Sequence, residues 1–202
     1  MVIFKCGLFG LQSFSAIDSG VDMAVLEIDA MKASDLDEIM GIERESFSMP
    51  WSRWMFEREL EGSERSHFLV ARNASDPVQR DSQSTKIAGY VGFWMVMGEA
   101  HIVTIAVRRN YRRKGIGTML LASALILAWS LGADRATLEV RVTNIPAQNL
   151  YRKFGFEIIS IRKGFYTDTG EDAYVMWMCN LGDKIGEIRA LVQKARDPMK
   201  TS

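Results

Sequence analysis

A basic segment that ends in two glycines contains the residue types that hold phosphate groups. Gly115 and Gly117 fall where a long apolar helix should begin. The first turn of a helix leaves backbone N–H groups unpaired at the positive end of the helix macrodipole, and glycine lets an anion approach them closely. Mobile positive charge would come from Arg108, Arg109, Arg112, Arg113 and Lys114. The segment therefore predicts an anion-binding cradle.

Two apolar elements should flank this cradle. The segment from His101 to Val107 is rich in β-branched residues, which is typical of a buried strand. Apolar residues from Ile116 to Leu131 recur at helical spacing, and Gly132 follows as a helix stop. The loop matches neither a Walker P-loop nor the Gly-x-Gly-x-x-Gly fingerprint. A plain turn with solvated cations is the alternative reading.

Glu139 and Tyr151 are candidates for acid–base chemistry downstream of the cradle. Glu139 alternates with Leu138 and Val140 in an expected strand, so it should face away from the apolar side. Tyr151 falls on an expected helix capped by Thr143 or Asn144. A carboxylate can take a proton from an amine, and a phenol can donate to a leaving thiolate. A salt-bridged glutamate and an ordinary core tyrosine remain the structural alternatives.

The same stretch resembles the GNAT superfamily of acyl-CoA-dependent N-acetyltransferases. Arg112-x-x-Gly115-x-Gly117 is similar to the family signature Arg/Gln-x-x-Gly-x-Gly/Ala. The segment Leu138–Arg141, then Asn144, then Asn149–Phe156 resembles the RimI branch, whose members acetylate the N-terminal alanine of a small-subunit ribosomal protein. The resemblance covers roughly residues 24–180 and implies an α/β GNAT fold, with a mixed central sheet of about seven strands and helices on both faces.

The resemblance also implies roles for individual residues. Glu139 would be the general base, acting directly or through water, and Tyr151 the general acid. Acetyl-CoA would be the acetyl donor, bound by Ile105, Ala106, Val107, Arg112, Arg113, Lys114, Gly115, Ile116, Gly117, Thr118 and Asn144. A strand splayed from its neighbour would present backbone groups of residues 105–107 to the thioester, where an N–H donor forms an oxyanion hole. Pro50, Trp51 and Tyr166 would touch the acceptor peptide, although surface or core packing explains them nearly as well.

Composition limits the class of protein. The 202 residues are 48% apolar and carry 25 basic and 25 acidic side chains, which suits one α/β domain and disfavours broad binding to nucleic acid or acidic membranes. Two cysteines and two histidines give neither a disulfide framework nor a metal-ligand pattern. We expect a cytoplasmic enzyme without metal, with no membrane span.

The domain division follows the extent of the resemblance. We expect an N-terminal extension over 1–22, the acetyltransferase domain over 23–181, and a tail over 182–202 that forms an amphipathic helix and then frays. The extension has no assigned role; Met23 is an alternative start, and a signal peptide is disfavoured. The oligomeric state and any activating partner are left open.

The remaining elements follow from periodicity and turn signals. Strands are expected near 25–28, 67–71, 87–97, 156–163 and 173–179. A helix near Ser34–Phe47 should be capped by Ser34, with another helix after Pro50 and Ser52. The polar segment 73–86 should be a surface loop.

The acceptor can be considered through its pKa. An α-amine titrates near about 7.7–8.0 and a lysine near about 10.4, so a single modest base suits an α-amine better. Acetylation of a small amine or of a lysine is the enzymatic alternative. A noncatalytic acyl-CoA-binding protein is the alternative from another class.

Overall fold

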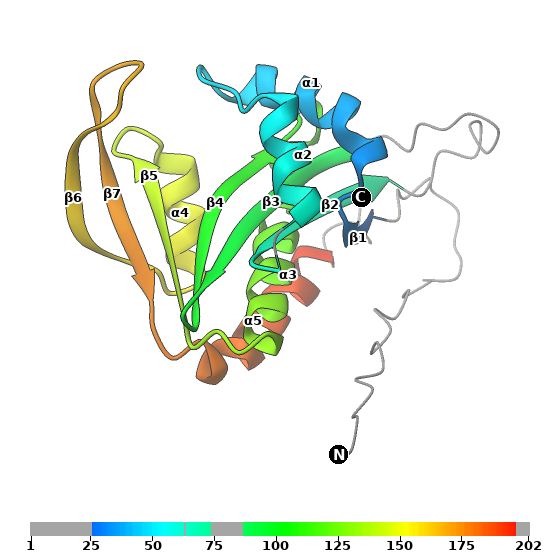
Figure 1. Cartoon of the computed structure of the whole chain (residues 1–202). Coiled ribbons are helices and arrows are strands. Elements are labelled where there is room, and N and C mark those ends of the chain that lie inside the picture. Colours follow the sequence, from blue (N-terminus) through cyan, green and yellow to red (C-terminus); the bar gives the residue numbers. More distant parts are fainter. Residues whose placement is uncertain (1–25, 63, 74–86, 197–202) are drawn as a thin grey trace, which may run out of the picture.

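The computed structural model describes residues 26–62, 64–73 and 87–196, which form a mixed sheet with helices on both faces (Figure 1). The sheet order is β1-β2-β3-β4-β5-β7-β6. The strands are β1 (Leu26–Ala30), β2 (Ser66–Asn73), β3 (Ile87–Val96), β4 (Glu99–Val107), β5 (Arg135–Arg141), β6 (Glu157–Tyr166) and β7 (Glu171–Met178). The helices are α1 (Leu36–Ser46), α2 (Arg53–Gly62), α3 (Ile116–Ser130), α4 (Ile145–Lys153) and α5 (Leu181–Arg196), with 3-10 turns η1 (Ala33–Asp35) and η3 (Arg109–Tyr111). The expected fold class is confirmed.

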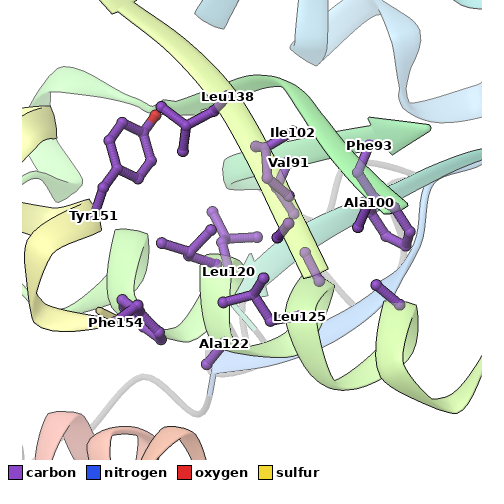
Figure 2. Close-up of a cluster of buried hydrophobic side chains, with 14 of the residues drawn as sticks. Val91, Phe93, Ala100, Ile102, Leu120, Ala122, Leu125, Leu138, Tyr151 and Phe154 are labelled. Carbon is purple, nitrogen blue, oxygen red and sulfur yellow. The ribbon is translucent and has the colours of Figure 1, made fainter. Parts of the chain in front are cut away.

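Two apolar clusters hold the helices onto the sheet. The first cluster lies on the face covered by α3, α4 and α5 and includes Leu120, Leu138 and Phe154 (Figure 2). The second cluster lies under α1 and α2 and includes Ile39 and Phe56. Alternation along β2, β3 and β4 divides the side chains of these strands between the two clusters. The two faces of the sheet are therefore separately packed.

The helix α3 is apolar around most of its circumference because it is covered twice. One side packs on β3 and β4, and the other packs on α5 (Figure 1). Leu181, Ile185 and Ile188 of α5 are buried in the first cluster. The helix expected in the C-terminal tail is present, and it contributes to the same core as the sheet. Residues 197–202, where fraying was expected, lie outside the described residues.

The helix boundaries agree with most of the expected signals. Gly132 and Gly155 follow α3 and α4 with φ values of 95° and 83°, which favour glycine. Asn144 caps α4 by accepting the Ala147 N–H at 3.2 Å.

The expected cap at Ser34 is wrong. A 3-10 turn begins one residue earlier, and Asp35 accepts the Lys32 N–H at 2.8 Å. Asp35 is fixed there because Arg72 of β2 pairs with it at 2.6 Å. A contact 37 residues away thus determines where this helix begins.

Two expectations cannot be compared with the fold. The extension over 1–22 and residues 74–86 of the loop expected over 73–86 lie outside the described residues, whereas Asn73 is the last residue of β2. No helix among the described residues is long and apolar enough to span a membrane.

Candidate active site

The strands β4 and β5 run in parallel but separate before either ends. They pair over four positions, from Glu99 with Arg135 to Ile102 with Leu138. The register of β4 against β3 shifts there, because Thr104 pairs with Gly92 and Ile102 with Phe93, which leaves Val103 as a bulge. Beyond this point the two strands diverge (Figure 1). The expected splay is present, and it opens the sheet beside residues 103–107.

Glu139 is the first residue of β5 beyond the paired segment, and it faces the side of α1 and α2. Its Oε2 lies 2.7 Å from His101 Nε2, and its Oε1 accepts a hydrogen bond from Arg162 Nη1 at 2.6 Å. The hydrogen bond from His101, assisted by Arg162, lowers the pKa of Glu139. The carboxylate is therefore ionised at neutral pH and held by two partners.

The residue His101 is the main feature that the sequence interpretation missed. The sequence alone predicts it only as the first residue of a strand and as an isolated histidine. A signal for the contact exists in the parallel register, because His101 pairs with Thr137, and Glu139 lies two residues further on the same face. Arg162, 23 residues away from Glu139, has no comparable local signal.

Tyr151 approaches the opening from the opposite face. It is 5% exposed, belongs to the first cluster and points from α4 toward Leu138 on β5 (Figure 2). Burial, with a smaller contribution from Tyr166, raises the pKa of the Tyr151 phenol. The hydroxyl consequently stays protonated throughout the neutral range and can donate a hydrogen bond into the opening.

The cradle is formed as expected at the start of α3. Arg113 and Gly115 have positive φ values of 64° and 79°, and Gly115 is the N-cap. Within the described part of the chain, no acceptor binds the backbone N–H groups of residues 113–118. Six consecutive donors at a helix N-terminus favour a negatively charged group.

Not all of the expected positive charge is mobile. The Arg112 Nε donates to the Val107 carbonyl at 3.0 Å, and Arg108 pairs with Glu38 at 3.3 Å. Both guanidinium groups thus brace the loop against β4 and α1. Arg113 and Lys114 are exposed. The interpretation of Arg108 and Arg112 as mobile charge is wrong, although both keep the loop in place.

The residues expected to touch the acceptor lie in the α1–α2 loop and at the β6–β7 turn, and these two segments contact each other. Ser48 donates a hydrogen bond to Asp168, and Thr167 Oγ1 lies 3.8 Å from Met49 Sδ. Arg141 pairs with Asp168 at 2.7 Å. These contacts join the α1–α2 loop to the β6–β7 turn on the side of Glu139.

The three residues expected to touch the acceptor differ in their surroundings. Trp51 is half-buried and packs on Phe56, with 5.3 Å between ring centroids. The Tyr166 ring lies 3.9 Å from the Arg141 guanidinium carbon, and its phenol is electrostatically coupled to Glu139. Pro50 is exposed. Of these three residues, Tyr166 is therefore the one whose side chain interacts with the Glu139 carboxylate.

A buried carboxylate lies beneath the α1–α2 loop. Glu43 of α1 is 1% exposed. Its Oε2 accepts the Trp51 backbone N–H at 2.6 Å, and its Oε1 accepts the Tyr90 hydroxyl. The Tyr90 hydroxyl is also 3.1 Å from Thr104 Oγ1. Burial raises the pKa of Glu43 to about 7, against the opposing effect of the Trp51 N–H.

A helix N-terminus with backbone donors, an ionised carboxylate and a protonated phenol around one opening are groups that suit acyl transfer. The comparisons identify the family. Residues 36–156 match the model of the Acetyltransferase (GNAT) family, and the chain belongs to that family. The protein is an acyltransferase of the RimI-like branch.

Individual relatives support the assignment. A Bacillus subtilis protein, provisionally named a ribosomal protein bS18-alanine N-acetyltransferase, is 42% identical over 148 residues, or 73% of this chain and 91% of the relative. The Escherichia coli ribosomal protein bS18-alanine N-acetyltransferase is 30% identical over 151 residues, or 74% of this chain and 94% of the relative. Its crystal structure superposes with a TM-score of 0.65, covering 77% of this chain and 94% of that one.

A more distant neighbour shares the fold. Arabidopsis thaliana NAA60, solved in complex with acetyl-CoA, gives a TM-score of 0.69 at 21% identity, covering 77% of this chain and 98% of that one.

The Glu43 environment predicts a pH-dependent stability. A carboxyl whose pKa is raised on folding stabilises the folded state fully below its unfolded pKa, and this contribution is lost as pH rises through about 7. Glu43→Gln removes that dependence. The free energy of unfolding of the variant, relative to wild type, should increase from pH 5 to pH 8 by on the order of 3 kcal/mol.

Urea unfolding at several pH values measures this difference. Glu61→Gln, at an exposed position on α2, is the matched control and should leave the pH profile of wild type unchanged. Parallel profiles for wild type and Glu43→Gln would show that Glu43 has an ordinary pKa.

Proposed function

We propose that the protein is a cytoplasmic, acetyl-CoA-dependent N-terminal acetyltransferase that modifies the N-terminal alanine of a small-subunit ribosomal protein. One observation carries the proposal: Glu139 with His101, and Tyr151 with the cradle, reach the same opening between β4 and β5 from opposite faces of the sheet. The names of the Bacillus and Escherichia relatives support the choice of acceptor.

The donor side of the site fits a pyrophosphate and an extended thioester arm. Acetyl-CoA supplies the acetyl thioester. The N–H groups of residues 113–118 bind the phosphates, with Arg113 and Lys114 adding charge. Ile105, Ala106 and Val107 lie where β4 has left β5, so the backbone groups of this segment that do not pair with β3 can bind the arm and polarise the thioester carbonyl. Asn144, whose side-chain oxygen caps α4, retains amide donors for the same arm.

The acceptor side supplies the base. A carboxylate with a lowered pKa holds a proton weakly, so Glu139 is better suited to stabilise a proton on its partner than to keep one. The His101 imidazole, hydrogen-bonded to Glu139 at 2.7 Å, can take the amine proton while the carboxylate stabilises the imidazolium. We therefore assign the base to the Glu139–His101 pair, acting directly or through water.

Tyr151 stabilises the leaving group. A thiol of the cysteine type has a pKa near about 8.5, below that of a phenol. Because burial raises the Tyr151 pKa further, complete proton transfer to the thiolate is uphill. Tyr151 contributes chiefly by donating a hydrogen bond to the sulfur as the C–S bond breaks.

The acceptor assay tests the proposed function directly. Purified protein is incubated with acetyl-CoA and peptides that begin with Ala, Ser, Met or acetyl-Ala, some with an internal lysine, and the added mass is located by tandem mass spectrometry. We expect acetylation of free N-terminal alanine. A polyamine set covers the small-amine alternative, and lysine-only or polyamine-only modification would contradict the ribosomal acceptor. Tight acetyl-CoA binding in calorimetry without transfer to any acceptor would favour the noncatalytic alternative.

Replacement of Glu139 tests the base. Glu139→Gln keeps the size of the side chain and removes its charge, so kcat should fall by about 10²–10⁴-fold. The loss should be largest at low pH, where neutral amine is scarcest. Steady-state rates from pH 6 to pH 9 measure it. Glu157→Gln, at an exposed position on β6, makes the same charge change away from the opening; equal rates in both variants would refute the assignment.

Replacement of Tyr151 tests the hydrogen-bond donor. Tyr151→Phe should lower kcat about 10–100-fold while the Kd for acetyl-CoA stays within about twofold. Because the Tyr151 pKa is raised, wild-type kcat should show no decline from phenol ionisation up to about pH 9.5. Tyr174→Phe, at a half-buried position packed against the same core, is the control. A weakened Kd with unchanged kcat would make Tyr151 a binding residue.

A further inference from the structure

The α1–α2 loop has little backbone support of its own. Phe47 donates to the Glu43 carbonyl at the end of α1, and Met55 donates to the Ser52 carbonyl at the start of α2. Between them, among the described residues, the Trp51 N–H to Glu43 Oε2 hydrogen bond is the one that holds the backbone of residues 48–51. The backbone of this loop is therefore held by a single buried side chain, while its own side chains contact Phe56 and the β6–β7 turn.

Glu43 also connects the loop to the splayed strand. Through Tyr90 of β3 it reaches Thr104, which adjoins the bulge at Val103 where β4 leaves β5. A carboxyl with 1% exposure is costly to bury unless its oxygens are hydrogen-bonded. Here both oxygens are hydrogen-bonded. Oε2 accepts the Trp51 N–H of the loop, and Oε1 accepts the Tyr90 hydroxyl, which in turn contacts Thr104 of β4. Glu43 thus links the backbone of the loop to the strand that borders the opening of the sheet.

The α1–α2 loop also contacts the β6–β7 turn, on the side of the sheet that carries Glu139. Ser48 contacts Asp168, and Met49 contacts Thr167, both in the β6–β7 turn. Arg141, which pairs with Asp168, comes from the same strand as Glu139. A shift of Trp51 would displace Ser48 and Met49, and with them the wall beside the base.

We propose that Glu43 is a positioning residue for the acceptor: it holds residues 48–51 where they bind the acceptor peptide, while acetyl-CoA binding on the opposite face does not depend on it. The inference rests on the proposed function, because it assumes a peptide acceptor between the α1–α2 loop and the β6–β7 turn. Glu43 acts through Trp51 and Tyr90 and touches no reacting atom.

The kinetic test separates positioning from general destabilisation. Glu43→Ala should raise the KM for an Ala-initiated peptide at least about tenfold, while the KM for acetyl-CoA stays within about twofold. Glu43→Gln should restore the peptide KM to within about threefold of wild type, because its amide oxygen can accept the Trp51 N–H and its NH₂ can donate to Tyr90. Ile39→Ala, in the second cluster on the same helix, destabilises the fold while keeping the hydrogen bond between Glu43 and the Trp51 N–H, and should leave both KM values unchanged.

A second measurement does not require activity. Native-state hydrogen exchange of the Trp51 amide should be at least about tenfold faster in Glu43→Ala than in wild type or Ile39→Ala. Unchanged Trp51 exchange, or an equal rise of the peptide KM in Glu43→Ala and Ile39→Ala, would overturn the proposal. If no peptide is acetylated by wild type, the proposed function fails, whereas the exchange result still decides whether Glu43 holds the loop. Should Glu43→Ala not fold, Glu43→Leu, which fills the site without an acceptor, serves in both assays.

Discussion

The site depends on the early separation of β4 from β5. Parallel strands normally continue their ladder until one ends, but here the pairing stops after Ile102 and Leu138, and the bulge at Val103 rotates the following residues of β4. The separation leaves backbone groups exposed inside the sheet, which is tolerated where a ligand can bind them. It also gives access to the same point from both faces of the sheet. Glu139 and Tyr151, which belong to opposite faces, can therefore act on one reaction.

Local sequence signals predicted the elements that this opening requires. Gly115 and the apolar periodicity of α3 predicted where this helix starts, Gly132 predicted its end, and Asn144 was one of two residues predicted to cap α4. Each of these residues lies within a few positions of the helix end that it predicts. Ser34 failed as a cap because Arg72 fixes Asp35 instead. Helix ends were thus predictable where nearby residues satisfy the backbone hydrogen bonds. They were not predictable where an ion pair with a distant residue determines the first residue of the helix.

The chemistry of the site was only partly predictable for the same reason. The family resemblance drew attention to Glu139 and Tyr151, but the partner His101 is 38 residues from Glu139 and is brought close only by strand register. The mobile charge of the cradle is smaller than the sequence predicts, because the Arg108 and Arg112 side chains are held by Glu38 and by the Val107 carbonyl. Glu43 gave no signal at all, since an acidic residue on an amphipathic helix is ordinarily exposed.

The two assigned groups have pKa values shifted in opposite directions, and this difference bears on substrate choice. Hydrogen bonds lower the pKa of Glu139, while burial raises that of Tyr151. The first stays ionised and the second stays protonated across the neutral range, so neither has to change its charge before the reaction. The ionisation of the acceptor amine then weighs heavily in the pH dependence of the rate. An α-amine is partly neutral near pH 8, whereas a lysine at that pH is almost fully protonated. Under the proposed function, these protonation states would favour a protein N-terminus without needing a pocket that excludes lysine.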